Sequence, residues 1–230
     1  MNTPMTPPAQ KPAAVLFDMD GTLVDTEHLW WEATSEIAAE LGYQLGESDV
    51  PQVLGRAVEH TAAHLAAVLH GSSPGAAVIG ERLNAAFTAR VGARVVPRPG
   101  ALALLEQLRD AAVPTALVSA SPRQVVDLVL THLGRDWFAV TLAAEDTELT
   151  KPDPAPYLAA AARLGLDPAA CVAVEDTPTG VTSAHAAGCA VLAVPSSDVA
   201  MPSAPGITLL TSLTEADLPL LAALTSGNAE

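Results

Sequence analysis

The chain has 230 residues, with 26 acidic side chains against 11 basic ones, so its formal net charge is -15. A protein that neutralises the phosphates of a nucleic acid or an anionic membrane needs a basic surface, so this balance argues against both partners. Half of the residues are apolar and 16% are charged, which indicates a globular protein with a substantial core. No apolar run approaches the roughly 20 residues that a membrane-spanning helix requires.

The two ends of the chain lack the patterns of folded segments. Residues 1–12 are rich in proline and polar residues and contain no apolar signal region, so we expect a disordered lead and a cytoplasmic protein. Residues 226–230 are expected to form a frayed tail. Cys171 and Cys189 lie in apolar runs without metal-binding spacing, which predicts two reduced, buried thiols.

Short continuous apolar runs recur along the chain and are typical of strands buried on both faces of a parallel sheet. They are Ala13 to Phe17, Val113 to Val118, Ala139 to Ala143, Cys171 to Val174 and Ala190 to Val194. Helix-length amphipathic segments lie between them at Pro99 to Ala111, Pro122 to Leu133, Pro154 to Leu164 and Pro178 to Ala187. This alternation predicts an α/β fold with a Rossmann-like parallel-sheet core.

Residues 26–96 do not alternate in this way. Only helical patterns occur there, at His28 to Leu41, Arg56 to Leu69 and Ala76 to Val91. We therefore predict an all-helical cap domain over 26–96, inserted into a discontinuous catalytic core formed by 13–25 and 97–225. An ordinary helical excursion of one domain is the alternative.

Carboxylates follow two of the predicted strands. Asp18 and Asp20 come directly after the first strand, and Glu175 and Asp176 end a later one. Parallel strands end at the same edge of a sheet, so we expect these four side chains to converge. Such an oxygen-rich group suits a hard cation, and Mg²⁺ fits best because it leaves positions for water and phosphate. Taken alone, the Asp-x-Asp-Gly segment is equally compatible with a solvated turn.

Two further residues predict an anion site near these acids. Ser119 ends a third strand just before a helix, where a hydroxyl and backbone N–H groups can hold an anion. Lys151 is one of only two lysines in the chain, and Pro152 and Pro154 of its segment restrict the backbone. A solvated surface lysine is the alternative.

These residues together closely resemble the haloacid dehalogenase superfamily, in the branch with a helical cap after the first strand. That branch includes β-phosphoglucomutases and sugar-phosphate phosphatases. The motifs appear in order as Asp18-Met19-Asp20-Gly21-Thr22, Ser119, Lys151-Pro152 and Glu175-Asp176, and they span nearly the whole chain after the lead. One departure is Thr150, where relatives often have glycine.

The resemblance implies a phosphatase that hydrolyses small phosphate monoesters, with sugar phosphates as the expected substrates. Asp18 is the implied nucleophile, which forms an aspartyl-phosphate. Asp20 is the implied general acid and base. Ser119, the backbone amide of Ala120 and Lys151 are implied to hold the phosphoryl oxygens.

The resemblance also implies a Mg²⁺ site. Its ligands are Asp18, the backbone carbonyl of Asp20 and Asp176, with Glu175 nearby or acting through water. The expected partner is therefore a small-molecule phosphate ester, with no nucleic acid and no membrane, and we expect the chain to be a monomer.

Single positions narrow the choice of reaction. Dehalogenases of the superfamily lack the second aspartate, so Asp20 favours phosphoryl transfer. Phosphonate-cleaving relatives need a cap lysine, and residues 26–96 contain none. β-Phosphoglucomutases carry a cap histidine where this chain has Trp30, which favours hydrolysis over transfer between sugar hydroxyls. That transfer stays an alternative, and a non-catalytic protein that binds phosphate metabolites is an alternative of a different class.

The helical segment offers two candidate substrate contacts. Glu27, in Asp25-Thr26-Glu27 before a tryptophan, resembles 2-deoxyglucose-6-phosphate-type phosphatases. Arg56 lies where relatives place a substrate-contacting loop, although a surface arginine at a helix start fits the sequence nearly as well.

Other polar residues of this segment are not expected to take part in the chemistry. His60 and His64 have the i, i+4 spacing of a zinc pair but lack a third ligand. Asp49 and Glu81 are interpreted as solvated helix-end charges.

Overall fold

The structure, a computed structural model, describes residues 11–54, 56, 58–69, 74–196 and 199–226. It divides into two compact units. Unit 1 comprises Met1–Leu23, Pro97–Arg123 and Gly134–Glu230, and unit 2 comprises Val24–Val96 and Gln124–Leu133. Residues 1–10 of the expected lead and 227–230 of the expected tail lie outside the described residues.

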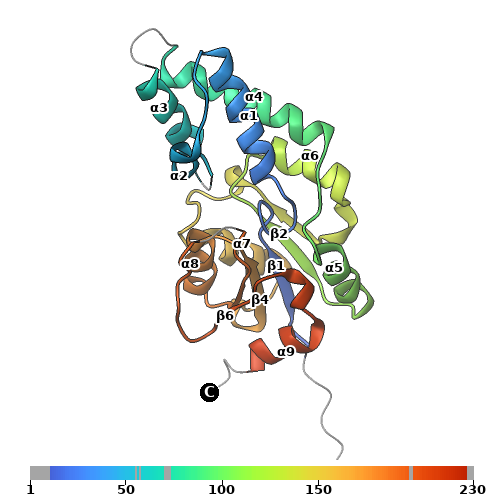
Figure 1. The fold of residues 1–230 in the computed structure, drawn as a ribbon. Coiled ribbons are helices and arrows are strands. Elements are labelled where there is room, and N and C mark those ends of the chain that lie inside the picture. Colours follow the sequence, from blue (N-terminus) through green and yellow to red (C-terminus); the bar gives the residue numbers. More distant parts are fainter. Residues whose placement is uncertain (1–10, 55, 57, 70–73, 197–198, 227–230) are drawn as a thin grey trace, which may run out of the picture. The chain divides into compact units, whose positions relative to one another are not determined.

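Within the described part of unit 1, a six-stranded parallel sheet forms the centre (Figure 1). Its strands are β1 (Ala14–Phe17), β2 (Thr115–Val118), β3 (Val140–Leu142), β4 (Cys171–Glu175), β5 (Ala190–Ala193) and β6 (Ile207–Leu209). They are ordered β3-β2-β1-β4-β5-β6, and each neighbouring pair is parallel. The predicted α/β, Rossmann-like class is confirmed.

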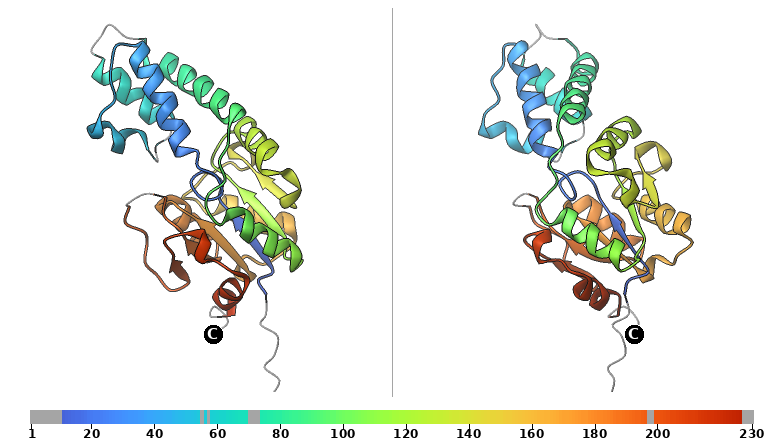
Figure 2. Two further views of the ribbon diagram at one scale, coloured as in Figure 1. Left: turned by 45° about the vertical axis from the view of Figure 1, so that its right-hand side comes forward. Right: turned by 90° about the vertical axis from the view of Figure 1, so that its right-hand side faces the viewer.

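Helices cover both faces of this sheet (Figure 2). They are α5 (Ala101–Asp110), α7 (Ala155–Leu164), α8 (Pro178–Ala186) and α9 (Leu218–Ser226). Helices α7 and α8 pack on one face, while α9 packs on β4 and β5 from the other face and contacts α5. Short 3-10 helices lie at Arg135–Trp137, Ala144–Asp146, Pro168–Ala170 and Leu213–Glu215. Because both faces are covered, every residue of β1, β2, β4 and β5 is buried.

One core cluster lies between the sheet and helices α7 and α8. Alternate strand residues such as Leu16, Val118 and Ala173 point to this side and meet Tyr157 and Val181. Tyr157 heads the large side chains that are fully buried within the described residues. Its position under the sheet edge becomes important for the site described below.

The start of the described chain is fastened to unit 1. Lys11 Nζ donates hydrogen bonds to the carbonyl oxygens of Ala111, at 2.8 Å, and Ala112, at 3.1 Å. Pro12 is buried. Of the last two residues of the expected lead, Lys11 is therefore hydrogen-bonded to unit 1 at its surface, and Pro12 is packed into it.

Unit 2 is helical. It contains α1 (Glu27–Glu40), a 3-10 turn (Glu47–Asp49), α2 (Val50–Val53), α3 (Val58–Val68), α4 (Ala76–Ala93) and most of α6 (Arg123–Leu133). Trp30 lies in the core of this unit. Its ring packs edge-on against the Phe87 ring, with 5.5 Å between the ring centres, and its Nε1 donates a hydrogen bond to the Val53 carbonyl at 2.9 Å. The unit thus begins at Val24 and adds Gln124–Leu133 to the stretch expected to form the cap. A cap function for residues 26–96 stays a prediction.

Strand β6 and helix α9, near the end of the chain, were not predicted from the sequence. Strand β6 is only three residues long, and its side chains are half-buried or exposed, so it lacks a continuous apolar run. Helix α9 is apolar along most of its length, and the sequence offers no amphipathic stripe to mark it. None of the helices that the structure describes is long and apolar enough to cross a membrane.

Asp49 is buried, so the prediction that it is a solvated charge was wrong. Its carboxylate accepts hydrogen bonds from the Tyr43 hydroxyl at 3.0 Å and the Gly46 amide at 2.8 Å, and His64 Nε2 lies 2.7 Å from Oδ1. Burial raises the pKa of Asp49, but these hydrogen bonds outweigh burial and lower the pKa below its ordinary value. His60 contacts Gln52 instead, at 2.8 Å, so the two histidines have different partners and do not form a zinc pair.

We predict that Asp49→Ala lowers the free energy of unfolding by about 1–3 kcal/mol, because it removes the buried acceptor that Tyr43, Gly46 and His64 share. Urea denaturation at pH 7 measures this loss, and Glu81→Ala, at an exposed position of α4, is the matched control with almost no effect. Since folding lowers the pKa of Asp49, its contribution is fully present above about pH 4 and is lost as the pH falls through that lowered pKa. Equal stability of the two variants at pH 7 would contradict the prediction.

Candidate active site

The ends of three neighbouring strands position the predicted site residues of unit 1. Asp18 follows β1, Ser119 follows β2, and Glu175 ends β4. Phe17 is level with Leu117 on one side and with Val174 on the other, so the three ends lie at the same edge. In the sheet order, β2 and β3 lie on one side of β1, whereas β4, β5 and β6 lie on the other side. The order of the strands therefore reverses at β1, and the site lies at this topological switch point.

Lys151 connects these strand ends. Its Nζ donates to Asp18 Oδ1 at 2.6 Å, to Glu175 Oε1 at 2.6 Å and to the Val118 carbonyl at 2.9 Å. An ammonium has three N–H donors, so all of them are used. Burial lowers the pKa of Lys151, but the Asp18 and Glu175 carboxylates outweigh burial and raise the pKa above its ordinary value. Lys151 is therefore a fixed, permanently charged cation, and the alternative of a solvated surface lysine is excluded.

Asp18 is almost completely buried, with 6% of its surface exposed. Among the described residues, nothing forms a hydrogen bond with its Oδ2 atom, which is also buried. Burial raises the pKa of Asp18 well above its ordinary value; Lys151 opposes this shift, while Glu175, Asp176 and Asp20 add to it. A second cation beside Oδ2 would compensate both the unpaired oxygen and the excess of negative charge.

The carboxylates fit a metal ion in that place. Asp18, Glu175 and Asp176 each offer an oxygen atom, and these atoms lie within 4.8 Å of one another. Asp176 is held in turn by the hydroxyls of Thr22, at 3.2 Å, and Ser196, at 2.6 Å. A donor set made only of oxygen atoms suits a hard divalent cation.

Gly21 leaves the space that Asp176 needs. Its φ of 82° lies in the left-handed region, and a Cβ atom here would overlap Asp176 Oδ2. Only glycine therefore permits both this backbone conformation and the approach of the carboxylate.

The predicted anion site faces Asp20. Ser119 Oγ donates to Asp20 Oδ2 at 3.1 Å, Ser121 Oγ donates to the same atom at 2.7 Å, and the Ser121 amide donates to Ser119 Oγ at 2.9 Å. The Ser119 hydroxyl must therefore turn from Asp20 to contact a phosphoryl oxygen. Within the described part of the chain, no hydrogen bond occupies the exposed Ala120 amide, which leaves it open to an anion.

Glu175 is completely buried and has both oxygen atoms occupied. Oε1 accepts from Lys151 and from the Tyr157 hydroxyl, each at 2.6 Å, while Oε2 accepts from the Asp176 amide at 3.2 Å and from Thr177 Oγ1 at 3.3 Å. Burial, reinforced by Glu175 and Asp18, raises the pKa of Tyr157 well above its ordinary value. The hydroxyl therefore keeps its proton and donates to Glu175.

Sequence reasoning missed several residues of this constellation: Thr22, Ser121, Tyr157, Gly180 and Ser196. Thr22 and Ser121 lie within or beside the motifs, so their position in the sequence was a usable signal. Ser196 follows the end of β5, and the strand-end argument applied to the other strands would have included it. Tyr157 lies on the apolar face of a helix, and the sequence pattern of such a face does not show that its hydroxyl contacts a residue of the site.

The two candidate substrate contacts belong to unit 2. Glu27 is the first residue of α1 and is half-buried. Arg56 is exposed between α2 and α3, and its Nε donates to the Pro51 carbonyl at 2.9 Å. A role for either residue in substrate binding stays a prediction.

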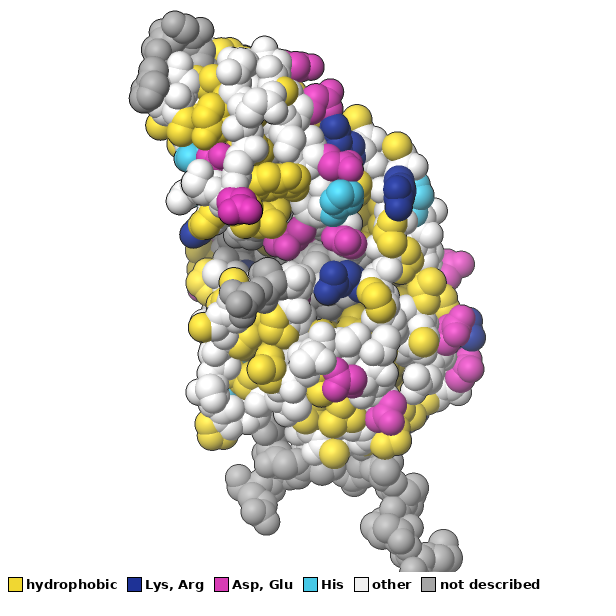
Figure 3. Space-filling model, in the orientation of Figure 1, with side chains coloured by type: hydrophobic (Ala, Val, Ile, Leu, Met, Phe, Trp, Pro, Cys, Tyr) yellow, Lys and Arg dark blue, Asp and Glu magenta, His cyan; other side chains and the backbone are white. Residues whose placement is uncertain are grey.

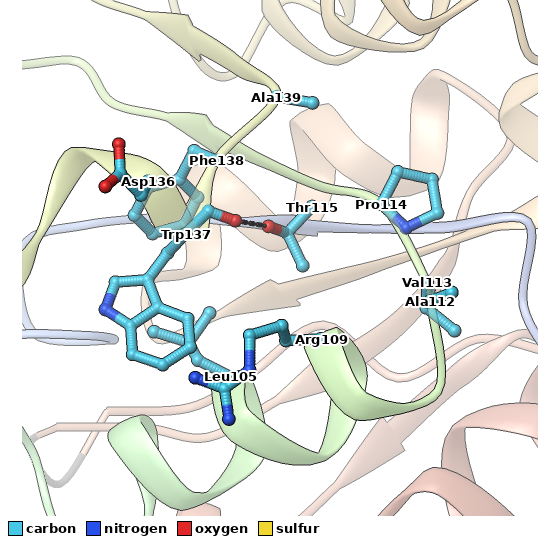
Figure 4. Close-up of a pocket in the computed structure, with 10 residues that line it drawn as sticks. All are labelled: Leu105, Arg109, Ala112, Val113, Pro114, Thr115, Asp136, Trp137, Phe138 and Ala139. Atoms are coloured by element: carbon cyan, nitrogen blue, oxygen red, sulfur yellow. Dashed lines mark hydrogen bonds between the residues drawn. The ribbon is translucent and has the colours of Figure 1, made fainter.

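A pocket of about 390 Å³ lies elsewhere in unit 1 (Figure 4). It is located at the amino-terminal ends of β2 and β3, opposite to the edge that carries the carboxylates. The Thr115 hydroxyl donates to the Trp137 carbonyl, and the Arg109 guanidinium lies 5.1 Å from the centre of the Trp137 ring and pairs with Asp110. The pocket therefore lies apart from the carboxylates that follow β1 and end β4.

Buried carboxylates bridged by a lysine at the carboxyl edge of a parallel sheet define a class of hydrolases, and the comparison with known families agrees. Residues 12–188 match the family described as a hydrolase, haloacid dehalogenase-like hydrolase. The chain belongs to this family, which confirms the predicted superfamily and the prediction of an enzyme.

Individual relatives include proteins named as phosphatases. Hexitol phosphatase B of Escherichia coli (strain K12) is 33% identical over 193 residues, which cover 83% of this chain and 86% of the relative. Validoxylamine A 7'-phosphate phosphatase of Streptomyces hygroscopicus subsp. limoneus is 31% identical over 205 residues, or 89% and 95% of the two chains. Among solved structures, CbbY from Rhodobacter sphaeroides in complex with phosphate is similar with a TM-score of 0.75 and 25% identity, covering 89% of this chain and 96% of that one.

Gly180 in α8 gives a test of how closely Glu175 is packed. A Cβ atom at Gly180 would overlap the Glu175 carboxylate, whereas at Gly80 in α4 it would meet the nearest atoms at 3.7 Å. We predict that Gly180→Ala lowers the free energy of unfolding by about 1–3 kcal/mol through overpacking, while Gly80→Ala leaves it equal or raises it by up to about 1 kcal/mol through helix propensity. Denaturant unfolding of both variants measures the difference, and stabilisation by Gly180→Ala would contradict this packing.

Proposed function

We propose that this chain is a Mg²⁺-dependent phosphatase that hydrolyses small phosphate monoesters, principally sugar phosphates, through an aspartyl-phosphate. The observation that carries this proposal is the Lys151 ammonium, 2.6 Å from both Asp18 and Glu175, beside a buried Asp18 oxygen without a hydrogen-bond partner among the described residues. The enzyme class is a phosphoric monoester hydrolase of the haloacid dehalogenase type, supported by the family match and the phosphatase relatives. The names of those relatives point to phosphorylated sugar alcohols and related compounds.

The cation fits the acidic side of the site. The side chains of Asp18 and Asp176 and the backbone carbonyl of Asp20 would hold Mg²⁺, with Glu175 nearby or acting through water. When bound, Mg²⁺ supplies the positive charge that offsets repulsion between the Asp18 carboxylate and the phosphate. The three carboxylate oxygens within 4.8 Å of one another and the unpaired Oδ2 support this assignment.

The side chains and one backbone amide of the protein carry out the attack on phosphorus, the proton transfers and the binding of the phosphoryl oxygens. An Asp18 carboxylate oxygen attacks phosphorus, and the departing alkoxide takes a proton from Asp20. Lys151, the Ser119 hydroxyl and the Ala120 amide hold the phosphoryl oxygens while charge shifts among them. Water then attacks the phosphorus of the aspartyl-phosphate and gives its proton to Asp20, which releases inorganic phosphate and regenerates the Asp18 carboxylate.

Hydrolysis is favoured over transfer between sugar hydroxyls by the packing of Trp30. Its ring lies in the core of unit 2, and its Nε1 donates to the Val53 carbonyl, so this position offers no acid or base for a sugar hydroxyl. A β-phosphoglucomutase-type transfer and a non-catalytic binding protein are the competing functions, and the two experiments below separate them.

A small substrate agrees with the charge of the surface. Asp and Glu side chains are spread over the face of the molecule in Figure 3, with few Lys and Arg among them. Such a surface repels extended polyanions but has little effect on a small ester that reaches a fixed local cation. We further propose that the chain acts as a cytoplasmic monomer.

We predict that Asp18→Asn abolishes the Mg²⁺-dependent release of phosphate, because the amide is not a nucleophile for phosphorus. The measurement is phosphate release from an aryl phosphate and from a panel of hexose, pentose, glycerol and glycolate phosphates, with and without a chelator. The control is Asp110→Asn, whose side chain is 71% exposed and which should behave like the wild type. Turnover retained by Asp18→Asn would refute the nucleophile, and a wild-type protein that binds phosphate without turnover would indicate the binding protein.

A second experiment separates hydrolysis from transfer. We predict that the wild-type protein, given β-glucose 1-phosphate and a trace of the bisphosphate, releases free phosphate, because water rather than a sugar hydroxyl takes the phosphoryl group. Phosphorus NMR follows both products in the same sample. Conversion to glucose 6-phosphate without free phosphate would show that the enzyme is a mutase.

A further inference from the structure

The buried hydroxyl of Tyr157 has a role that packing does not explain. The side chain is fully buried in the core cluster beneath β4, where phenylalanine would fill the same space without a polar atom to satisfy. Its hydroxyl donates to Glu175 Oε1 at 2.6 Å, and the same oxygen accepts from Lys151 at 2.6 Å. We propose that Tyr157 is a positioning residue that acts through Glu175 to aim Lys151 at the phosphoryl group. This inference rests on the function proposed for the site.

The three donors of Lys151 show what has to be positioned. One is fixed by the Val118 carbonyl, one by Glu175 Oε1, and the third is directed to Asp18 Oδ1. A phosphoryl group that approaches Asp18 meets this third donor, because the other two point at groups built into the core. A lysine side chain has four flexible carbon–carbon bonds, so its direction depends on such fixed acceptors.

Glu175 is a fixed acceptor only if its own carboxylate does not rotate. Two donors hold Oε2, namely the Asp176 amide at 3.2 Å and Thr177 Oγ1 at 3.3 Å. Both distances are longer than the 2.6 Å hydrogen bond from Tyr157 to Oε1. The phenol, carried by a rigid ring in the core, is thus the strongest constraint on Glu175 that does not come from Lys151 itself.

The aromatic ring makes a separate contact with the lysine. Lys151 Nζ lies 5.2 Å from the centre of the Tyr157 ring, within cation–π range. Tyr157→Phe keeps this contact and the packing of the core, and it removes only the hydrogen bond to Glu175. This substitution therefore isolates the proposed role.

The chain supplies a matched control. It contains only two tyrosines, and each donates its hydroxyl to a carboxylate that is buried: Tyr157 to Glu175 and Tyr43 to Asp49. Tyr43→Phe makes the same chemical change in unit 2, outside the residues proposed for the chemistry.

In steady-state kinetics, Tyr157→Phe should lower kcat about tenfold with KM changed less than about twofold, because the lysine acts where charge develops in the transition state. Tyr43→Phe should match the wild type. In a double-mutant cycle, Tyr157→Phe should add less than about twofold to the effect of Glu175→Gln, since the hydroxyl acts only through that carboxylate. Wild-type kinetics for Tyr157→Phe would overturn the inference. So would a further loss of kcat of about tenfold when Tyr157→Phe is added to Glu175→Gln.

A second readout does not depend on turnover. Since the chain has two lysines, selective ¹⁵N-lysine labelling gives an ammonium signal for Lys151 that is resolved from the exposed Lys11. Tyr157→Phe and Glu175→Gln should each accelerate hydrogen exchange of the Lys151 ammonium about tenfold, and Tyr43→Phe should not. The use of two variants keeps the test available if one does not fold.

The two readouts distinguish the failure of the two proposals. Faster exchange at Lys151 in a protein that hydrolyses no phosphate ester would refute the proposed function and leave the Tyr157 constraint established. Normal phosphatase activity combined with unchanged exchange in Tyr157→Phe would refute the positioning role alone. Slower turnover with unchanged exchange would also refute it, because Lys151 would then not be the residue affected.

Discussion

The ammonium of Lys151, held between Asp18 and Glu175, is the interaction on which the rest of the site depends. Removing several carboxylates from water at one edge of a sheet costs several kcal/mol for each unpaired charge, so the site needs a cation within the protein. Lys151 provides one, at 2.6 Å from both partners, but it cannot balance Asp176 and Asp20 as well. Burial, and to a smaller extent the neighbouring carboxylates, raise the pKa of Asp18, and its Oδ2 has no hydrogen-bond partner among the described residues. The divalent cation of the proposed function would compensate this remaining negative charge.

The parallel sheet makes this concentration of charge possible. Every residue of β1, β2 and β4 is buried, and the charged and hydroxyl side chains of the site lie at or just after the carboxyl ends of these strands. The strands are in register, and their ends therefore bring Asp18, Ser119 and Glu175 together from positions far apart in the sequence. Two glycines leave space for the carboxylates: a side chain at Gly21 would overlap Asp176, and one at Gly180 would overlap Glu175.

The same logic explains what the sequence could and could not predict. Five strands and the motif residues of the core were predictable, because short continuous apolar runs mark buried strands and polar residues at the ends of parallel strands share one edge. Strand β6 was not, since a short, half-exposed edge strand leaves no such run. The burial of Asp49 depends on His64, which approaches from another helix, and the spacing of residues along one helix does not reveal that contact. The hydrogen bond of Tyr157 is hidden for a similar reason, because an apolar helix face looks the same whether its aromatic residue carries a hydroxyl or not.

The scarcity of basic residues bears on the small anionic substrate that we propose for the site. Within the described residues, several arginines form ion pairs with carboxylates, among them Arg82, Arg90, Arg109, Arg123 and Arg163. These pairs leave little positive charge on a surface whose formal net charge is -15. Under the proposed function, attraction of an anion would depend on short-range contacts at Lys151 and at the proposed cation, which ionic screening weakens much less than it weakens long-range steering. A compact phosphate ester would satisfy such contacts while the acidic surface would repel larger polyanions, so the overall acidity and the proposed anion site would act together.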